Sequence, residues 1–489
     1  MNQPNFILIL ADDMGYSDLG CYGSEINTPN IDSLASTGVR FSQMYNSARC
    51  CPSRAALLTG LNPQQTGVGH MVSTFGQPNS ITVPAYQGYL NETSATIPEV
   101  LKTNGYNTYM SGKWHVGGGY DLLNPSSWNA GDDTHPTPTQ RGFDEFFGIV
   151  AGGGSYFNTK TLMRNDKFIN IETPDFYLTD AITDNAVSMI DEAGDSPFFL
   201  HVAYTAPHWP LHALEEDIAK YEGKYLKGWD YFRTARHEEM KGLGIIDSKW
   251  DISPRDSDVG DWEDAKYPDW EDSKMAAYSA MIDSMDQGIG RVVKTLKESG
   301  QLENTLIFFM SDNGGCAELM REDGDWSNTS QWETNLINGE PVRVGNIPNL
   351  RPGPGTTFQS YETPWTNVSN SPFRLFKRWI HEGGISAPLI VHWPNKINEP
   401  RVESEPLHIM DIPATSIDAA GANYPNEFNG NKIKPLEGES FLDLLSNKWS
   451  REKPMYWEHE GNQGIRKGEW KLVKEYGGDW ELYNMNDDR

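Results

Sequence analysis

Two short apolar runs that end in carboxylates constrain the fold of this chain most strongly. Residues 6–11 read Phe-Ile-Leu-Ile-Leu-Ala and pass directly into Asp12 and Asp13. Residues 305–310 read Thr-Leu-Ile-Phe-Phe-Met and lead to Asp312 two positions later. Continuous apolar runs of this length are typical of strands buried on both faces of a parallel sheet. The chain is therefore expected to contain a covered sheet with acidic groups at the strand ends.

Further runs extend this pattern along the chain. Residues 196–204 and 388–392 are again apolar and lead into segments rich in Trp and Pro, and helical patterns cover residues 96–103 and 274–298. Strands that alternate with helices predict an α/β fold, here a large, mostly parallel central sheet flanked by helices. In such sheets ligand sites gather at the carboxyl ends of the strands, so the site is expected there.

The C-terminal part has a different pattern. Two short alternating runs, residues 464–473 and 480–485, predict exposed antiparallel strands around a Gly-Gly turn. We predict a large α/β domain over residues 1–400 and a smaller α+β subdomain over residues 401–489. Residues 225–273, rich in Trp, Asp and Lys, are expected to form a surface insertion or a lid.

Charge and composition exclude several classes of protein. The 489 residues carry a formal net charge of −28, which argues against binding nucleic acid because phosphate backbones require basic faces. No apolar run approaches the roughly 20 residues of a membrane span. The N-terminus enters its first strand without a basic region or a cleavable leader. The protein is expected to be periplasmic or secreted if a leader has been removed, and cytoplasmic otherwise.

The acidic strand ends can hold a metal ion. Asp12, Asp13 and Asp312 offer carboxylates and Asn313 offers an amide oxygen. Hard cations prefer all-oxygen ligands, so Ca²⁺ fits best, Mg²⁺ less well, and zinc poorly. The alternative is that each pair caps a helix or stabilises a turn, as Asp and Asn often do. Two pairs at the ends of two core strands favour the metal site.

A thiol lies at the predicted start of a helix. Cys50 and Cys51 precede Pro52, which can open a helix because Pro is favoured at the first helical position, and Gly60 can end the same helix. This places Cys50 at the positive end of the helix dipole, with Arg54 one turn further on, and suits an anionic substrate. The alternative is two ordinary buried or paired thiols, although a disulfide between adjacent cysteines would be strained.

Four more basic or titratable side chains occupy separate predicted loops. Lys113 and His115 are two positions apart and face the same way on an extended segment, His208 lies between two prolines, and Lys377 precedes a Glu-Gly-Gly segment. Singly, such residues are most often surface charges or structural histidines. Together at one strand-end crevice they would supply a local positive field in an acidic protein.

These motifs, in this order, resemble those of the type I sulfatases, and most closely those of bacterial arylsulfatases. The resemblance covers the whole chain and rests on the segments Asp-Asp (12–13), Cys-x-Pro-Ser-Arg (50–54), Gly-Lys-Trp-His (112–115), Pro-His (207–208), Asp-Asn-Gly-Gly (312–315) and Ser-Pro-Phe-Arg-Leu-Phe-Lys (371–377). It implies an alkaline-phosphatase-like fold. It also implies hydrolysis of sulfate monoesters, whether aryl sulfates or sulfated carbohydrates, to an alcohol or phenol and inorganic sulfate.

The resemblance also implies roles for individual residues. Cys50 would be oxidised by a maturase to formylglycine, whose hydrate is the nucleophile. Arg54 would hold the hydrate, Lys113 would bind hydrate and sulfate, and His115 would act as general base. His208 and Lys377 would grip the sulfate and assist the leaving oxygen. Ca²⁺ would be bound by the residues Asp12, Asp13, Asp312 and Asn313.

Two other functions fit part of the pattern. A phosphonate or phosphate monoester hydrolase of the same superfamily can use a similar constellation, although zinc phosphatases need histidine ligands that this set lacks. A non-catalytic binder of sulfated glycans would be expected to lack the cysteine or the metal ligands, which are all present here. The natural substrate, the position of its sulfate and the oligomeric state do not follow from the sequence.

Overall fold

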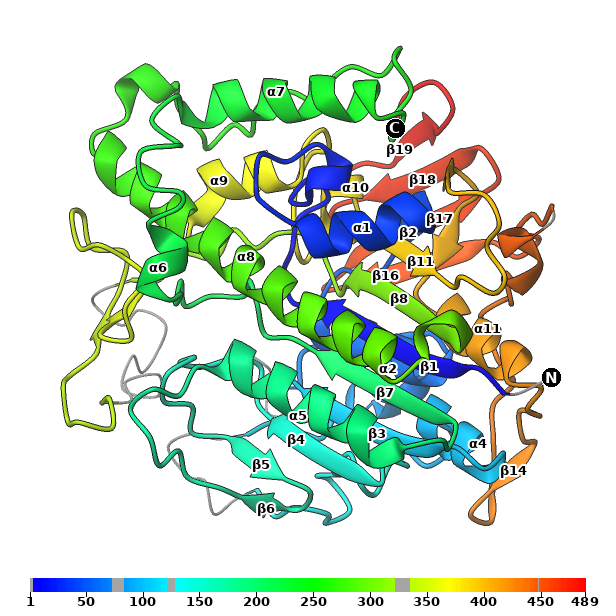
Figure 1. The fold of residues 1–489 in the computed structure, drawn as a ribbon. Helices are drawn as coiled ribbons and strands as arrows, with labels where there is room; N and C mark the ends of the chain where they lie inside the picture. Colours follow the sequence, from blue (N-terminus) through cyan, green and yellow to red (C-terminus); the bar gives the residue numbers. More distant parts are fainter. Residues whose placement is uncertain (1–2, 73–82, 121–127, 322–334, 447) are drawn as a thin grey trace.

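The central feature of the computed structural model is one large sheet (Figure 1). The structure describes residues 3–72, 83–120, 128–321, 335–446 and 448–489. The sheet has the order β12-β2-β11-β8-β1-β7-β3-β4-β5-β6, with β13 paired to β2. Its strands are β1 (Asn5–Ala11), β2 (Val39–Tyr45), β3 (Asn107–Gly112), β4 (Glu145–Ile149), β5 (Leu162–Arg164), β6 (Lys167–Phe168), β7 (Phe198–Ala203), β8 (Thr305–Ser311), β11 (Ser386–His392), β12 (Arg401–Glu403) and β13 (Leu407–His408).

Strand β1 lies in the middle of this sheet and is buried over its whole length. It pairs in parallel with β7 on one side and β8 on the other. Side chains alternate across a strand, so Phe6 and Leu8 join one hydrophobic core while Ile7 and Ile9 join the other. This double burial explains why the run is continuously apolar.

Helices cover both faces of the sheet (Figure 1). The core that contains Ile7 is completed by α1, α5, α7, α8 and α9, and the core that contains Phe6 by α2, α4 and α11. The helices are α1 (Pro29–Thr37), α2 (Cys50–Thr59), α3 (Pro63–Thr66), α4 (Ile97–Thr103), α5 (Leu178–Ala193), α6 (Glu215–Ile218), α7 (Gly228–Gly242), α8 (Pro268–Glu298), α9 (Glu362–Ser369), α10 (Glu382–Ile385) and α11 (Asp411–Ala419).

The predicted fold class is confirmed, because the sheet is mostly parallel and covered by helices on both faces. Strand β11 is an exception within the centre: it runs antiparallel to both of its neighbours, β2 and β8. Strand β5 is also antiparallel to its neighbours, β4 and β6, near one edge. An apolar strand buried on both faces reads the same in either direction, so the direction of β11 follows from its connections.

A second, antiparallel sheet lies near the C-terminal end of the sequence. It consists of β16 (Met455–His459), β17 (Asn462–Lys467), β18 (Trp470–Lys474) and β19 (Glu481–Asn484), in that order. The prediction of one strand over residues 464–473 is wrong, because Gly468, with φ 57°, allows a tight turn that divides this run into β17 and β18. Buried side chains of this sheet pack on the loop before α10.

The proposed division at residue 400 stays a prediction. Strands β12 and β13 follow that position and pair with β2 of the large sheet. Two-stranded sheets complete the strand inventory of the described residues: β9 (Arg343–Val344) with β10 (Thr357–Phe358), and β14 (Glu427–Phe428) with β15 (Asn431–Lys432).

The predicted insertion over residues 225–273 contains α7, which packs against α9 (Figure 1). Trp229 is buried and stacks edge to face on Trp262 and Trp365. These rings therefore stabilise the segment by packing. A different part of it, residues 254–258, lines a cavity described below.

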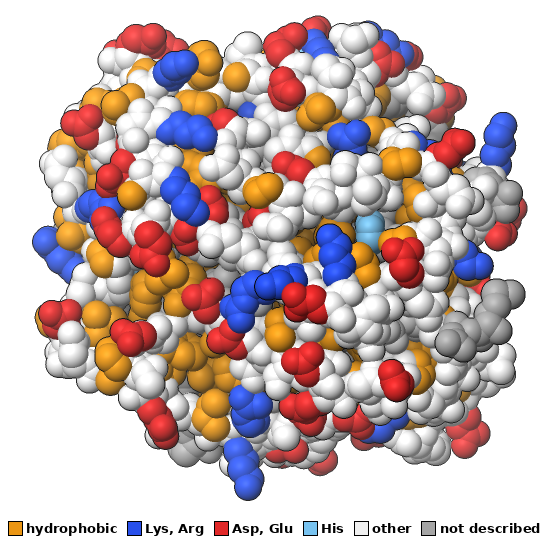
Figure 2. Space-filling view, in the orientation of Figure 1, with side chains coloured by type: hydrophobic (Ala, Val, Ile, Leu, Met, Phe, Trp, Pro, Cys, Tyr) orange, Lys and Arg blue, Asp and Glu red, His pale blue; other side chains and the backbone are white. Residues whose placement is uncertain are grey.

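Figure 2 shows acidic and basic side chains interspersed over one face of the molecule. None of the described helices is both long enough and apolar enough to traverse a lipid bilayer. Because surface charges of both signs are screened within about 8–10 Å, the basic groups that matter for an anionic ligand are those held inside the fold.

Candidate active site

Helix α2 presents Cys50 at its first turn. The preceding residue, Arg49, is extended (φ −153°, ψ 152°), and Gly60 ends the helix in the left-handed region with φ 70°. The end at Gly60 agrees with the prediction, whereas the helix begins at Cys50, two residues before the Pro52 that was expected to open it. The Cys51 thiol, which donates a hydrogen bond, and the nearby cation Lys113 lower the pKa of Cys50 well below its usual range, although burial opposes this shift. The position therefore stabilises negative charge.

The four predicted metal ligands lie together at the ends of β1 and β8. These strands are in register, with Ala11 opposite Ser311, so Asp12 and Asp312 leave the sheet side by side. The backbone N–H of Asp13 donates to Oδ1 of Asp312 at 3.2 Å, and Nδ2 of Asn313 donates to Oδ1 of Asp13 at 2.7 Å. All four side chains are buried.

Three basic side chains neutralise these carboxylates. Nζ of Lys113 lies 2.6 Å from Oδ2 of Asp12, and Nη2 of Arg54 lies 2.8 Å from Oδ2 of Asp312. Nζ of Lys377 lies 2.8 Å from Oδ2 of Asp13. Removing one partner of such a buried ion pair leaves an uncompensated charge and destabilises the protein by about 3–5 kcal/mol. Each charged side chain of the cluster therefore depends on its partner to remain buried in the folded protein.

His208 joins the same cluster. Its Nδ1 lies 2.6 Å from the carbonyl oxygen of Trp209, which makes Nδ1 the donor, and its Nε2 lies 3.4 Å from Oδ2 of Asp13 and 3.5 Å from Nζ of Lys377. The structure thus brings together all ten residues proposed from the sequence: Asp12, Asp13, Cys50, Arg54, Lys113, His115, His208, Asp312, Asn313 and Lys377. Their individual roles stay predictions.

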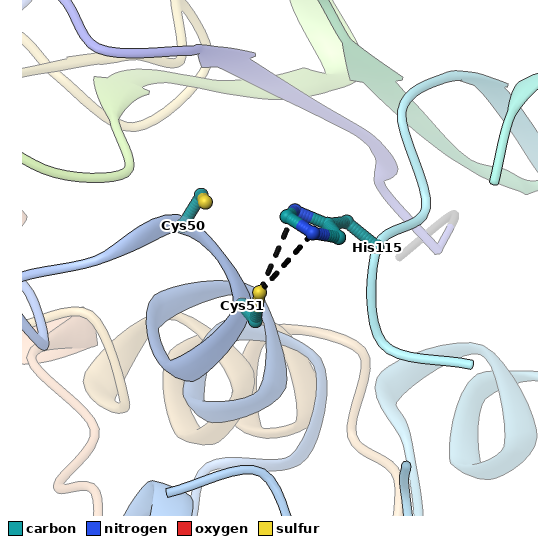
Figure 3. A group of neighbouring side chains, drawn as sticks. All are labelled: Cys50, Cys51 and His115. Atoms are coloured by element: carbon teal, nitrogen blue, oxygen red, sulfur yellow. Dashed lines mark hydrogen bonds between the residues drawn. The ribbon is translucent and has the colours of Figure 1, made fainter. Parts of the chain in front are cut away.

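His115 lies beside the start of α2 (Figure 3). Its imidazole is buried, and its Nε2 lies 3.3 Å from Sγ of Cys51. Burial lowers the pKa of His115 to about 4, so the ring is neutral at pH 7 and can accept a proton.

Two glycines that were not predicted as site residues pack against the two histidines. They belong to residues 151–154, which read Ala-Gly-Gly-Gly. A Cβ on Gly152 would lie 2.6 Å from Cε1 of His115, and one on Gly153 would lie 3.1 Å from Cε1 of His208. Glycine is required where backbone approaches a side chain this closely. Three consecutive glycines in the sequence were the available signal.

Gly152→Ala is therefore expected to reduce turnover more than stability. The added methyl group displaces the His115 ring, and misplacement of a catalytic group by about 1 Å costs roughly 100-fold in rate. The measurement is kcat with a sulfate ester, beside a thermal melt. Gly242→Ala, where nothing lies within 4 Å of the added carbon, is the matched control. Equal turnover of the two variants would contradict the close-approach argument.

A cavity of about 720 Å³ adjoins the cluster. Lys377 forms part of its wall, together with Arg49, Arg374 and residues 254–258. Glu318, which is not among the residues predicted from the sequence, also lines the cavity. Its carboxylate accepts a hydrogen bond from Nε1 of Trp209 at 2.8 Å and pairs with Arg49 at 3.2 Å. The sequence around Glu318 has no helical or strand periodicity, so nothing in it marked this residue as part of a site. The cavity can hold the organic part of a ligand whose anionic group reaches Lys377.

The residues at the strand ends fit a hard divalent cation. Oδ1 of Asp12 and Oδ1 of Asn313 are buried and accept no hydrogen bond from the described residues. Burial, together with the charge of Asp12, raises the pKa of Asp312 well above its usual range, which a cation would reverse. Buried carboxylate and amide oxygens that lack a hydrogen-bond donor are what a Ca²⁺ or Mg²⁺ site provides.

Comparison with known proteins agrees with this geometry. The sulfatase family model matches residues 4–422, and the model of the N-sulphoglucosamine sulphohydrolase C-terminal region matches residues 373–489. An arylsulfatase of Klebsiella aerogenes is 32% identical over 466 residues, covering 91% of this chain and 93% of that protein. An uncharacterized sulfatase of Schizosaccharomyces pombe is 32% identical over 522 residues, covering 100% and 89%.

A solved structure supports the same assignment. The structure of Ps i-CgsB in complex with k-i-k-neocarrahexaose has a TM-score of 0.66 and 28% identity to this chain, over 99% of this chain and 87% of that one. A phosphonate monoester hydrolase of Agrobacterium radiobacter, with a TM-score of 0.57 and 17% identity, shares the fold. The family match over most of the sequence, the relatives that align over nearly their full length, and the cluster of buried carboxylates and cations lead to one conclusion. The chain belongs to the sulfatase family and is a sulfuric ester hydrolase.

Proposed function

We propose that this sulfatase releases inorganic sulfate from aryl sulfates or sulfated carbohydrates, with Cys50, converted to formylglycine by a maturase, as the source of the nucleophile. The observation that carries the proposal is the position of Cys50 at the positive end of α2, within a ring of buried cationic groups. A hydrated aldehyde at this residue supplies two hydroxyls. One can attack sulfur and displace the alcohol or phenol; the other can then lose its proton and re-form the aldehyde as the C–O bond to the sulfate breaks, which an ordinary thiol or hydroxyl cannot do.

The cations are proposed to act on the sulfate group. Lys113 pairs with Asp12 and Lys377 with Asp13, and each lysine would also face sulfuryl oxygens. Arg54, paired with Asp312, would hold the nucleophile. Charge spreads over those oxygens in the transition state, so preorganised cations stabilise it more than they stabilise the substrate. These groups account for the binding of an anion by a protein with a net charge of −28.

Two histidines are proposed to move protons. Neutral His115 would remove a proton from the converted residue 50. His208, whose Nδ1 donates to the carbonyl of Trp209, keeps Nε2 directed at Lys377 and would assist the leaving oxygen. Asp12, Asp13, Asp312 and Asn313 would hold Ca²⁺, with Mg²⁺ the weaker candidate; when bound, this cation lowers the pKa of a coordinated hydroxyl and polarises a sulfate oxygen.

The pH dependence of turnover tests the role of His115. Its pKa of about 4 lies below the ordinary 6.5, so the unprotonated base is present above about pH 4 and is lost as the pH falls through that value. We expect kcat/KM to fall on the acid side with a midpoint near 4. The lowered pKa of His115 also affects stability. Between pH 4 and 6.5 the folded protein binds fewer protons than the unfolded protein, so the free energy of unfolding decreases as the pH is lowered through this range. An acid limb of the kcat/KM profile centred at pH 6.5 would contradict the proposed role of His115 as the base.

Paired assays test the reaction class. We expect p-nitrophenyl sulfate to be hydrolysed with a much higher kcat/KM than a phenyl phosphonate monoester. The reverse order would favour the phosphonate or phosphate monoester hydrolase that the sequence leaves open. Sulfated oligosaccharides then decide between an aryl and a carbohydrate substrate; Ps i-CgsB was solved with a neocarrahexaose, which makes carrageenan fragments a reasonable first set.

A further inference from the structure

A cluster of soft donor atoms surrounds the start of α2. Ligand atoms of Cys50, Cys51 and His115 all lie within 4.8 Å of one another, and all three residues are buried. Figure 3 shows the Cys51 sulfur directed at the imidazole, and the Cys50 side chain on the neighbouring position of the same helix turn. The distances from Sγ of Cys51 to Nε2 and Nδ1 of His115 are 3.3 and 3.5 Å.

A fourth soft atom adjoins this group. Sδ of the half-buried Met71 lies 3.5 Å from Sγ of Cys51. The thioether, the two thiols and the imidazole come from three separate parts of the chain: α2, the loop after α3, and the loop after β3. Two thiolates and an imidazole are ligands typical of zinc, and a thioether beside them also suits copper(I).

The reaction proposed above gives Cys51 no part. Its thiol adjoins the proposed nucleophile and the proposed base, yet neither the attack on sulfur nor the release of sulfate needs it. The soft set is also chemically distinct from the oxygen ligands at the ends of β1 and β8, which prefer hard cations. The start of α2 can therefore be selective for a different class of metal ion.

We propose that the chain with Cys50 still a thiol binds one thiophilic d¹⁰ cation, such as Zn²⁺, Cd²⁺ or Cu⁺, through Cys50, Cys51 and His115, with Met71 as an adjoining sulfur donor. Binding is an exchange: each thiol that becomes a ligand releases its proton to solvent, and no electron is transferred. On the proposed function, conversion of Cys50 to an aldehyde removes one ligand, so this site belongs to the unconverted protein.

Titration with Cd²⁺ tests the site without any assay of activity. The protein is expressed without a maturase, the Cys50 thiol is verified by mass, and excess Ca²⁺ is present to occupy the oxygen ligands. We expect thiolate-to-cadmium charge-transfer absorption that saturates at one equivalent. Cys51→Ser and His115→Ala should each weaken binding by about 100-fold or more, since they remove direct ligands, whereas second-sphere changes cost about 10–100-fold. Cys21→Ser is the matched control because Cys21 lies outside the cluster.

A second measurement needs no variant. Trypsin cleaves after Arg49 and Arg54, so Cys50 and Cys51 share one pentapeptide. One equivalent of Cd²⁺ should protect both thiols of this peptide from iodoacetamide. Labelling that Cd²⁺ does not slow, or absorption that Cys51→Ser leaves unchanged, would overturn the proposal. Neither result depends on sulfatase chemistry, so a failure of the proposed function would leave both measurements valid.

Discussion

Cys50→Ser is expected to abolish turnover while the protein stays folded. Serine cannot be converted to the aldehyde by an enzyme that acts on the thiol, and a hydroxyl at this position has no second group with which to expel sulfate. Loss of a nucleophile that acts together with its base commonly costs about 10⁶-fold in kcat. The measurement is sulfate release from p-nitrophenyl sulfate, with far-ultraviolet circular dichroism and a thermal melt to establish that the fold is intact.

The control for this variant is Cys21→Ser, at a free thiol that lies outside α2 and does not line the cavity. It should retain turnover if its fold survives. The conversion itself is read from the peptide of residues 50–54: replacement of CH₂SH by an aldehyde lowers its mass by about 18 Da and leaves one thiol for alkylation instead of two. Wild-type turnover of Cys50→Ser, or an active enzyme in which the peptide keeps both thiols, would refute the proposed nucleophile.

Removal of divalent cations is expected to abolish turnover and to lower the melting temperature. Asp12, Asp13 and Asp312 are buried within one cluster, and the burial of Asp312 near Asp12 raises its pKa well above the ordinary range. A bound cation stabilises the folded state by about 2.7 kcal/mol at a concentration 100 times its Kd. The measurement is activity and thermal melting after EDTA treatment and after return of Ca²⁺ or Mg²⁺.

The Cys50→Ser variant separates the two requirements. It should melt higher with Ca²⁺ than without, although it turns over nothing in either state. Asn313→Ala should lose much of this Ca²⁺-dependent stabilisation, whereas Asn304→Ala, at the other end of β8, should keep it. Full turnover of protein shown by elemental analysis to be metal-free would exclude a catalytic cation.

Much of the fold follows from local patterns. The run over residues 6–11 is apolar at every position because β1 is covered on both faces. Helix α2, Cys50–Thr59, has Pro52 in its first turn and Gly60 directly after its last residue. The proposed site residues also follow from sequence, because parallel strands bring their carboxyl ends to one edge of a sheet. Asp12 and Asp312 lie 300 positions apart and still meet for this reason.

Other features depend on contacts between distant segments. The direction of β11, the turn that separates β17 from β18, and the pairing of Glu318 with Trp209 and Arg49 involve choices that local sequence leaves open. Gly152 is unremarkable until the His115 ring is seen to occupy the space of its missing side chain. Cys51 likewise acquires a chemical environment only when His115 and Met71 approach it.

The sequence by itself determined the class of fold, the acidic strand ends, the thiol at a helix start and, through the order of its motifs, the family. These are properties of periodicity, helix capping and residue type, which act over a few positions. Only the tertiary structure decided which charges pair, which glycines contact the two histidines, and that four soft donor residues come together at the start of α2. Such contacts depend on packing between segments tens to hundreds of residues apart, and distances of a few ångströms there decide the chemistry.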